Sequence, residues 1–194
     1  IAVLIALFIQ MFRFAAEPFF FERAKHENAK ETYAFVMKYF VIIMLLVYLG
    51  INLYISGIQY IIGANFREAI VVVPIISMAY LFYGIYGNHS IWYKLNDLTR
   101  CGIYITLVGA SITILINVLL IPVYGYMASA WAHVASYGAM IVMSFILAEK
   151  HYKVYYNMKR LVPYFIIAVG MVVFGKFFVY PNLFSELTIN TVFV

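Results

Sequence analysis

The chain has 194 residues, of which 66% are hydrophobic and only 11% are charged. A soluble domain carries roughly 25% charged and less than 50% apolar residues, so this composition excludes an ordinary soluble fold with a charged surface. The formal net charge is +5. The basic residues are scattered over separate segments instead of converging on one surface, so we expect no nucleic-acid partner.

Long uncharged runs predict the secondary structure. A bilayer core of about 30 Å needs about 20 helical residues, and charged residues bracket several runs of that length. In chain order we predict membrane helices near residues 1–21, 35–57, 69–92, 102–121, 126–148 and 161–180, and a truncated seventh from 188. The predicted fold class is all-α, a polytopic integral membrane helical bundle in which residues 1–194 form a single transmembrane unit.

Prolines and the chain start refine this prediction. We expect Pro122 to follow one helix and, with Gly125, to separate it from the next. Pro163 is predicted in a first turn, whereas Pro18 and Pro74 are predicted inside helices, which they would kink. The chain begins with an apolar run that no signal-peptide pattern precedes. We therefore expect a fragment from the carboxyl side of a longer membrane protein.

Basic residues favour one orientation of the bundle. If the helices alternate in direction, loops 22–38, 93–101 and 149–160 share one side. Those three loops hold Arg23, Lys25, Lys30, Lys38, Lys94, Arg100, Lys150, Lys153, Lys159 and Arg160, whereas the opposite loops hold only Arg67. This asymmetry predicts a multi-pass protein of the cytoplasmic membrane with its basic loops in the cytoplasm.

The first predicted helix carries a polar stripe. At 100° per residue, Ala6, Gln10, Arg13 and Glu17 fall on one face, which we expect to point toward the bundle interior or water. Glu17 follows Arg13 by one turn and can pair with it. Two interpretations remain open. In the first, Arg13 extends to the membrane interface, or its pair with Glu17 only fixes the position of the helix. In the second, Arg13 is a cationic group in a hydrated cavity and faces an anionic substrate.

Other helices show similar polar faces. One face of the fourth helix holds Thr106, Thr113 and Asn117. The third helix has a face with Ser77 and Asn88, with Tyr80 at its edge. Such stripes serve either as contacts between helices or as the lining of a cavity. In the second case Gln10, Asn88, Thr113 and Asn117 would line it.

The polar face of the fifth predicted helix and two histidines can likewise be interpreted as interior contacts or as parts of a transport pathway. Ser129, His133, Tyr137, Met140 and Ser144 share one face of that helix. His89 and His133 lie at membrane depth, where each is either a proton relay or a hydrogen-bonded interior histidine, and the second interpretation is favoured.

Catalytic signatures are missing from the sequence. It contains no HExxH, CxxC, GxSxG or Walker motif, and no carboxylates within the membrane runs have metal-ligand spacing. We therefore expect neither an enzyme nor a bound metal or cofactor.

Four segments carry a family resemblance. They are "FRFAAEPFFFERAKHENAK" (12–30), "GIYGNHSIWYKLNDLTRCGIY" (84–104), "NVLLIPVYGYMASAWAHVASYGAMIV" (117–142) and "KHYKVYYNMKRL" (150–161). In this order they resemble the carboxyl-side half of bacterial polysaccharide biosynthesis proteins. These are O-antigen or oligosaccharide-lipid flippases of the same superfamily as the multidrug and toxin extrusion transporters. The likeness runs through roughly residues 8–175.

The resemblance implies two helical lobes around a central cavity, with this chain as the carboxyl-side lobe. It implies alternating access for a lipid-linked oligosaccharide, whose pyrophosphate Arg13 would attract while Glu17 positions Arg13 or couples to an ion. The implied partners are this substrate, membrane lipid, the missing amino-terminal bundle and polysaccharide assembly proteins.

Three alternatives stay open beside this interpretation. They are a drug or cation antiporter on the same fold, a membrane glycosyltransferase or ligase that acts on lipid-linked sugars, and a structural scaffold.

Overall fold

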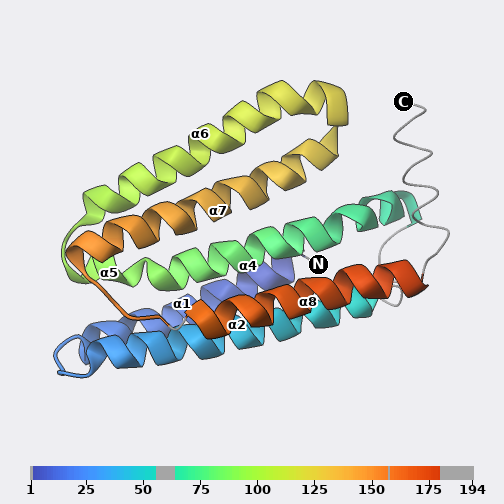
Figure 1. Ribbon diagram of the computed structural model, residues 1–194. Helices are drawn as coiled ribbons and strands as arrows, with labels where there is room; N and C mark the ends of the chain where they lie inside the picture. The colour runs from blue at the N-terminus through green and yellow to red at the C-terminus, as the bar shows by residue number, and fades with distance from the viewer. Residues whose placement is uncertain (1, 56–63, 157, 180–194) are drawn as a thin grey trace.

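The computed structural model describes residues 2–55, 64–156 and 158–179, and every regular element in these ranges is a helix. In chain order the elements are α1 (Ala2–Arg23), α2 (Ala29–Leu53), the 3₁₀ helix η1 (Ala64–Val72), α4 (Val73–His89), α5 (Ile91–Leu95), α6 (Thr99–Tyr124), α7 (Tyr126–His151) and α8 (Met158–Val179). The long helices lie alongside one another and reverse direction at their connections (Figure 1). The predicted all-α class is confirmed for these residues.

Several helices have the length and composition of membrane spans. In the described residues five segments qualify: Leu4–Arg23, Ala29–Leu53, Arg67–Leu95, Thr99–Tyr124 and Tyr126–His151. Large apolar side chains point away from the bundle along them, such as Phe14 at 74% and Val118 at 67% exposure. So much exposed apolar surface is unfavourable in water and favourable in lipid. The chain is therefore a multi-pass helical membrane protein.

Helix boundaries differ from the predicted ones in informative places. The helix predicted at 35–57 begins six residues earlier, because the helix-forming segment after Asn28 joins the apolar run. The helix predicted at 69–92 is divided into η1, α4 and α5. The helix predicted at 161–180 corresponds to α8, and the seventh predicted helix lies outside the described residues.

Three proline predictions are wrong. Pro122 lies inside α6, which continues to Tyr124. Its missing N–H removes one backbone hydrogen bond without ending the helix, which ends at Gly125, at φ 59°. Pro74 begins α4 instead of interrupting it, because a first-turn residue needs no intrahelical donor. Pro163 lies beyond the first turn, inside α8, and Pro18 lies inside α1 as predicted.

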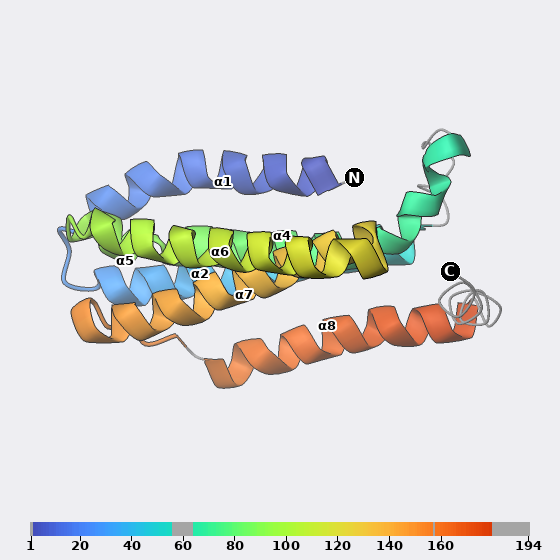
Figure 2. The ribbon, with the colours of Figure 1, turned by 90° about the horizontal axis from the view of Figure 1, so that it is seen from above.

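The helix α4 is the centre of the bundle. It contacts α1, α2 and α7, while α6 packs on α7 and α8 packs on α2. Figure 2 shows α1 and α8 at opposite edges of the bundle. The largest apolar cluster joins four helices through buried residues that include Ile9, Phe40, Leu81 and Val172.

A glycine allows the two first helices to approach α4 closely. A Cβ atom at Gly84 would lie 2.9 Å from Cζ of Phe40 and 3.3 Å from Cδ1 of Ile9. Either contact is tighter than carbon atoms normally make. Gly84 thus allows α2 and α1 to pack closely on α4, and α1 and α4 carry most of the candidate site.

The connections lie at the ends of the bundle that the predicted alternation of helix direction requires. Those that follow α1, α5 and α7 lie at the same end of the bundle (Figure 1). These connections contain or adjoin most of the basic residues counted above.

Candidate functional site

The candidate site begins on α1, at the edge of its packed face. Arg13 and Glu17 are half-buried there, whereas Gln10, one turn earlier, is exposed. Helical spacing places the two charged side chains together, so that Nη2 of Arg13 lies 3.3 Å from Oε1 of Glu17.

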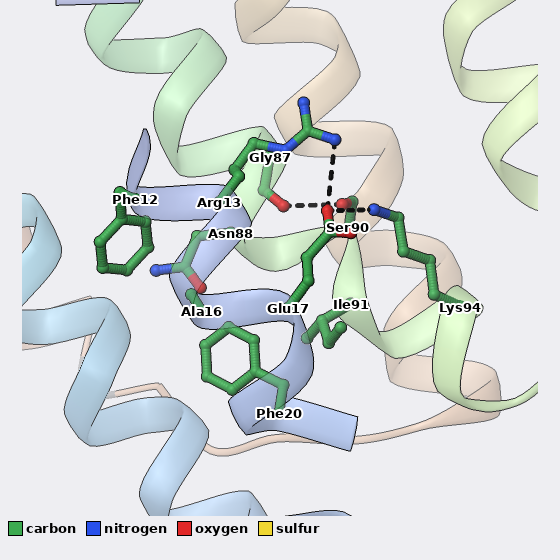
Figure 3. A pocket seen from close by; sticks show the side chains of 10 residues that line it. All are labelled: Phe12, Arg13, Ala16, Glu17, Phe20, Gly87, Asn88, Ser90, Ile91 and Lys94. Carbon is green, nitrogen blue, oxygen red and sulfur yellow. Dashed lines mark hydrogen bonds and ion pairs between the residues drawn. The ribbon is translucent and has the colours of Figure 1, made fainter. Parts of the chain in front are cut away.

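A second cation reaches the same carboxylate from α5. Nζ of Lys94 lies 2.5 Å from Oε1 of Glu17 (Figure 3). The short helix that carries Lys94 is anchored by the buried Trp92, whose carbonyl accepts a hydrogen bond from Nδ2 of Asn96 at 2.6 Å. Lys94 was not predicted as a site residue, because in the sequence it belongs to a basic loop that is 77 residues from Glu17.

The cluster of Arg13, Glu17 and Lys94 has a net positive charge. Two cations share one carboxylate, and the side chains of Arg13, Glu17 and Lys94 are 34%, 36% and 24% exposed. A carboxylate between two cations holds both in place but neutralises only one of them. The cluster therefore has one positive charge in excess, and its side chains are partly exposed.

Arg13 also contacts α4. Nη1 donates to the hydroxyl of Tyr83 at 3.4 Å, and the aliphatic part of the side chain passes over Gly87, where a Cβ would lie 3.4 Å from Cδ of Arg13. The buried Nε has no hydrogen-bond partner among the described residues. The guanidinium thus retains hydrogen-bonding capacity that no described side chain uses.

A small cavity lies between α1 and α4 beside this cluster (Figure 3). Its volume is about 10 Å³, and its lining includes Arg13, Glu17, Lys94 and Asn88. Asn88 is 4% exposed, and its Nδ2 has no partner in the described part of the chain. A volume of this size holds about one water molecule, so a larger ligand would bind to the exposed side of the cluster.

Three predicted site residues lie outside this cavity, namely Gln10 on α1 and Thr113 and Asn117 on α6. Thr113 and Asn117 are half-buried on α6, a helix that packs chiefly on α7. The hydroxyl of Thr113 donates to the carbonyl of Gly109 at 3.0 Å, and Oδ1 of Asn117 is buried without a partner in the described residues. The structure thus brings Arg13, Glu17 and Asn88 together, and it places Gln10, Thr113 and Asn117 outside their cavity.

Behind the site, a buried polar network joins α4 and α5 to α7. Oγ of Ser144 lies 2.8 Å from Nδ1 of His89 and accepts a hydrogen bond from Nε1 of Trp92 at 3.1 Å. All three residues are at most 2% exposed. His133 likewise has an internal partner, the carbonyl of Ser129 at 2.8 Å. Both histidines therefore make the interior hydrogen bonds that sequence analysis favoured.

In the described part of the chain, no group of three or more His, Cys, Asp or Glu side chains is arranged to hold a metal ion. Comparison with protein-family models, curated proteins and solved structures gave no match for this chain.

Proposed function

We propose that this chain is the carboxyl-side lobe of a flippase that moves a polyprenyl-pyrophosphate-linked oligosaccharide across the bacterial cytoplasmic membrane. The observation that carries the proposal is the half-exposed cluster of Arg13, Glu17 and Lys94, which has an excess positive charge within a membrane bundle. The family resemblance of the sequence supplies the substrate class.

The chemistry of the substrate explains why such a cluster is useful. A sugar pyrophosphate cannot enter hydrocarbon unless its polar groups find new partners. Arg13 and Lys94 offer several N–H donors to phosphate oxygens, and charge-assisted hydrogen bonds of this kind are stronger than neutral ones. The polyprenyl tail can stay in the bilayer throughout.

Glu17 has a specific role in this mechanism. Before the substrate arrives, its carboxylate holds both cations close to one oxygen atom. An arriving phosphate would replace the carboxylate as the partner of the cations, and Glu17 would take them back when the substrate leaves. No chemical bond changes, so the proposed activity is transport and not catalysis.

The rest of the transporter completes the cycle. The amino-terminal bundle would form the opposite wall of the cavity, and rocking of the two lobes would expose the cluster first to the cytoplasm and then to the other side. If the basic loops are cytoplasmic, the cluster extends from Arg13, near the middle of the span Leu4–Arg23, to Lys94, at the cytoplasmic end of the span Arg67–Leu95, on the side where the lipid-linked sugar is made. Polysaccharide assembly proteins would receive the product.

A drug or cation antiporter is less compatible with this geometry. It would need a carboxylate available to a cationic ligand, and Glu17 is already shared by Arg13 and Lys94. The glycosyltransferase or ligase alternative makes a different prediction, which is the release of free polyprenyl pyrophosphate from the substrate by the purified protein.

Complementation of export tests the proposal. The full-length protein with Arg13→Ala or Lys94→Ala would replace the native protein, and surface polysaccharide would be measured by immunoblot. Each variant loses a charge-assisted hydrogen bond of roughly 1.5–3 kcal/mol, so we expect export to fall about 10- to 100-fold at equal membrane abundance.

The matched control is Lys153→Ala. Lys153 pairs with Glu149 at the same helical spacing, with Nζ 3.0 Å from Oε1, but on an exposed surface. Its removal should leave export unchanged. Normal export by both cluster variants would refute the role of the cluster.

A further inference from the structure

The central helix α4 has two half-buried stripes, separated by buried residues, and only one of them carries tyrosines. Ile75, Met78, Phe82 and Ile85 form the first stripe, which is entirely apolar. Its Phe82 contacts α8, where the rings of Phe82 and Phe165 stack with centroids 5.5 Å apart. The second stripe contains Ile76, Tyr80, Tyr83 and Gly87 and adjoins α1, since Arg13 contacts both Tyr83 and Gly87.

A third tyrosine extends the second stripe onto α7. The ring centroid of Tyr137 lies 5.2 Å from that of Tyr83, which in turn lies 6.5 Å from that of Tyr80. All three side chains are half-buried. We call Tyr80, Tyr83 and Tyr137 the tyrosine cluster. It is continuous with the charged cluster, because the hydroxyl of Tyr83 accepts the hydrogen bond from Nη1 of Arg13 at 3.4 Å.

The position of these tyrosines along the membrane spans is unusual. Tyrosine favours the two membrane–water interfaces, yet Tyr83 and Tyr137 lie near the middle of the spans Arg67–Leu95 and Tyr126–His151. A hydroxyl that faces hydrocarbon without a partner is costly. We therefore expect the cluster to face a polar environment instead of lipid.

Two hydroxyls of this cluster, those of Tyr80 and Tyr137, are available to bind a ligand. Three other tyrosines use their hydroxyls internally: Tyr33 donates to the carbonyl of Phe20 at 2.9 Å, and the hydroxyls of Tyr86 and Tyr93 lie 3.3 Å apart. Within the described residues, the hydroxyls of Tyr80 and Tyr137 have no hydrogen-bond partner.

We propose that the tyrosine cluster is the subsite for the first sugar ring of the substrate, the ring attached to the pyrophosphate. A sugar ring has C–H groups on its faces, which pack on aromatic rings, and hydroxyls at its edge, which pair with phenol groups. The contact between Arg13 and Tyr83 places this subsite directly beside the phosphate site, in the order that the substrate requires. The subsite depends on the proposed function, since it needs a sugar pyrophosphate as ligand.

Two lipid probes separate the two sites. The full-length protein in nanodiscs would be titrated with polyprenyl pyrophosphate and with polyprenyl pyrophosphate that carries one N-acetylhexosamine. We expect the wild-type protein to bind the sugar-bearing probe more tightly. Tyr137→Leu and Tyr80→Leu should weaken that binding roughly three- to tenfold and change the binding of the sugar-free probe less than twofold.

Further variants identify the cause of an affinity change. Tyr137→Phe keeps the ring and loses the hydroxyl, so it should fall between the wild-type protein and Tyr137→Leu. Arg13→Ala should weaken the binding of both probes. Tyr104→Leu is the control, since Tyr104 is 61% exposed on α6, and it should bind both probes as the wild type does. Thermal unfolding of every variant would show that the fold is intact.

The outcomes distinguish the two proposals. Equal wild-type affinity for the probes, or an equal effect of the tyrosine variants on both, would overturn the sugar subsite while the proposed function stands. Binding of neither probe by the wild-type protein would overturn the proposed function and the subsite with it.

Discussion

Substitution of Glu17 by glutamine is the most direct test of how the charged cluster works. The change keeps the size of the side chain and removes the charge that Arg13 and Lys94 share through one oxygen, at 3.3 and 2.5 Å. Since the phosphate must replace this carboxylate, its loss should raise the affinity for the substrate. The same change should slow transport, because Glu17 no longer competes for the cations when the substrate leaves.

The size of the effect follows from the exposure of the cluster. A solvent-exposed ion pair contributes roughly 0.2–1 kcal/mol, and the side chains of Arg13 and Glu17 are about one third exposed. If the two pairs together oppose phosphate binding by about 1 kcal/mol, Glu17→Gln should tighten the binding of polyprenyl pyrophosphate about fivefold. The uncompensated repulsion between the two cations should lower the stability by a similar amount.

The assay uses the full-length protein in nanodiscs and measures binding of polyprenyl pyrophosphate at equilibrium, with export measured in cells. Glu149→Gln is the matched control, because this residue has the same spacing to its lysine on an exposed surface. That control should alter neither quantity. Weaker binding by Glu17→Gln would refute the exchange of carboxylate for phosphate and indicate that Glu17 only holds the cations in position.

Two further predictions concern the packing of α7. A Cβ at Gly109 would lie 2.5 Å from Sδ of Met140, so Gly109→Ala should destabilise the protein by roughly 1–3 kcal/mol in thermal unfolding. Adding Met140→Ala to this variant should partly restore its stability. Gly170→Ala is the control and should not destabilise the protein, because a Cβ at this position would have no neighbouring side chain within 4 Å. Loss of rescue would mean that the overlap with Met140 is not the cause. Ser144→Ala removes the hydroxyl that hydrogen-bonds to the buried His89 and Trp92, so it should lower the free energy of unfolding by roughly 1–3 kcal/mol. Ser111→Ala, on an exposed face, is the control and should leave the stability unchanged. Equal stability of the two variants would contradict a stabilising role of the buried network.

The helices of this protein were predictable because their signal is local. A span needs a run of apolar residues long enough to cross hydrocarbon, and that property can be counted along the chain. The errors in helix boundaries occurred where the same residue type is compatible with more than one position in a helix. Proline ends or begins a helix depending on where its missing N–H falls, so Pro74 and Pro122 were misplaced.

The candidate site was predictable only where it lies within one helix. Arg13 and Glu17 were identified together because a helical turn joins residues four apart. Lys94 is 77 residues away from Glu17, and no periodicity connects them. Tyr83 and Tyr137 belong to different predicted spans, so their contact could not be read from either stripe alone.

By itself, then, the sequence determined that the chain is a set of membrane helices with polar faces, since hydrophobicity and helical periodicity act over neighbouring residues. The tertiary structure alone decided which faces meet. Packing of α1, α5 and α7 around α4 places a second cation on Glu17 and a row of tyrosines beside Arg13. These contacts depend on the angles and distances between helices, which are set by close approaches such as that at Gly84.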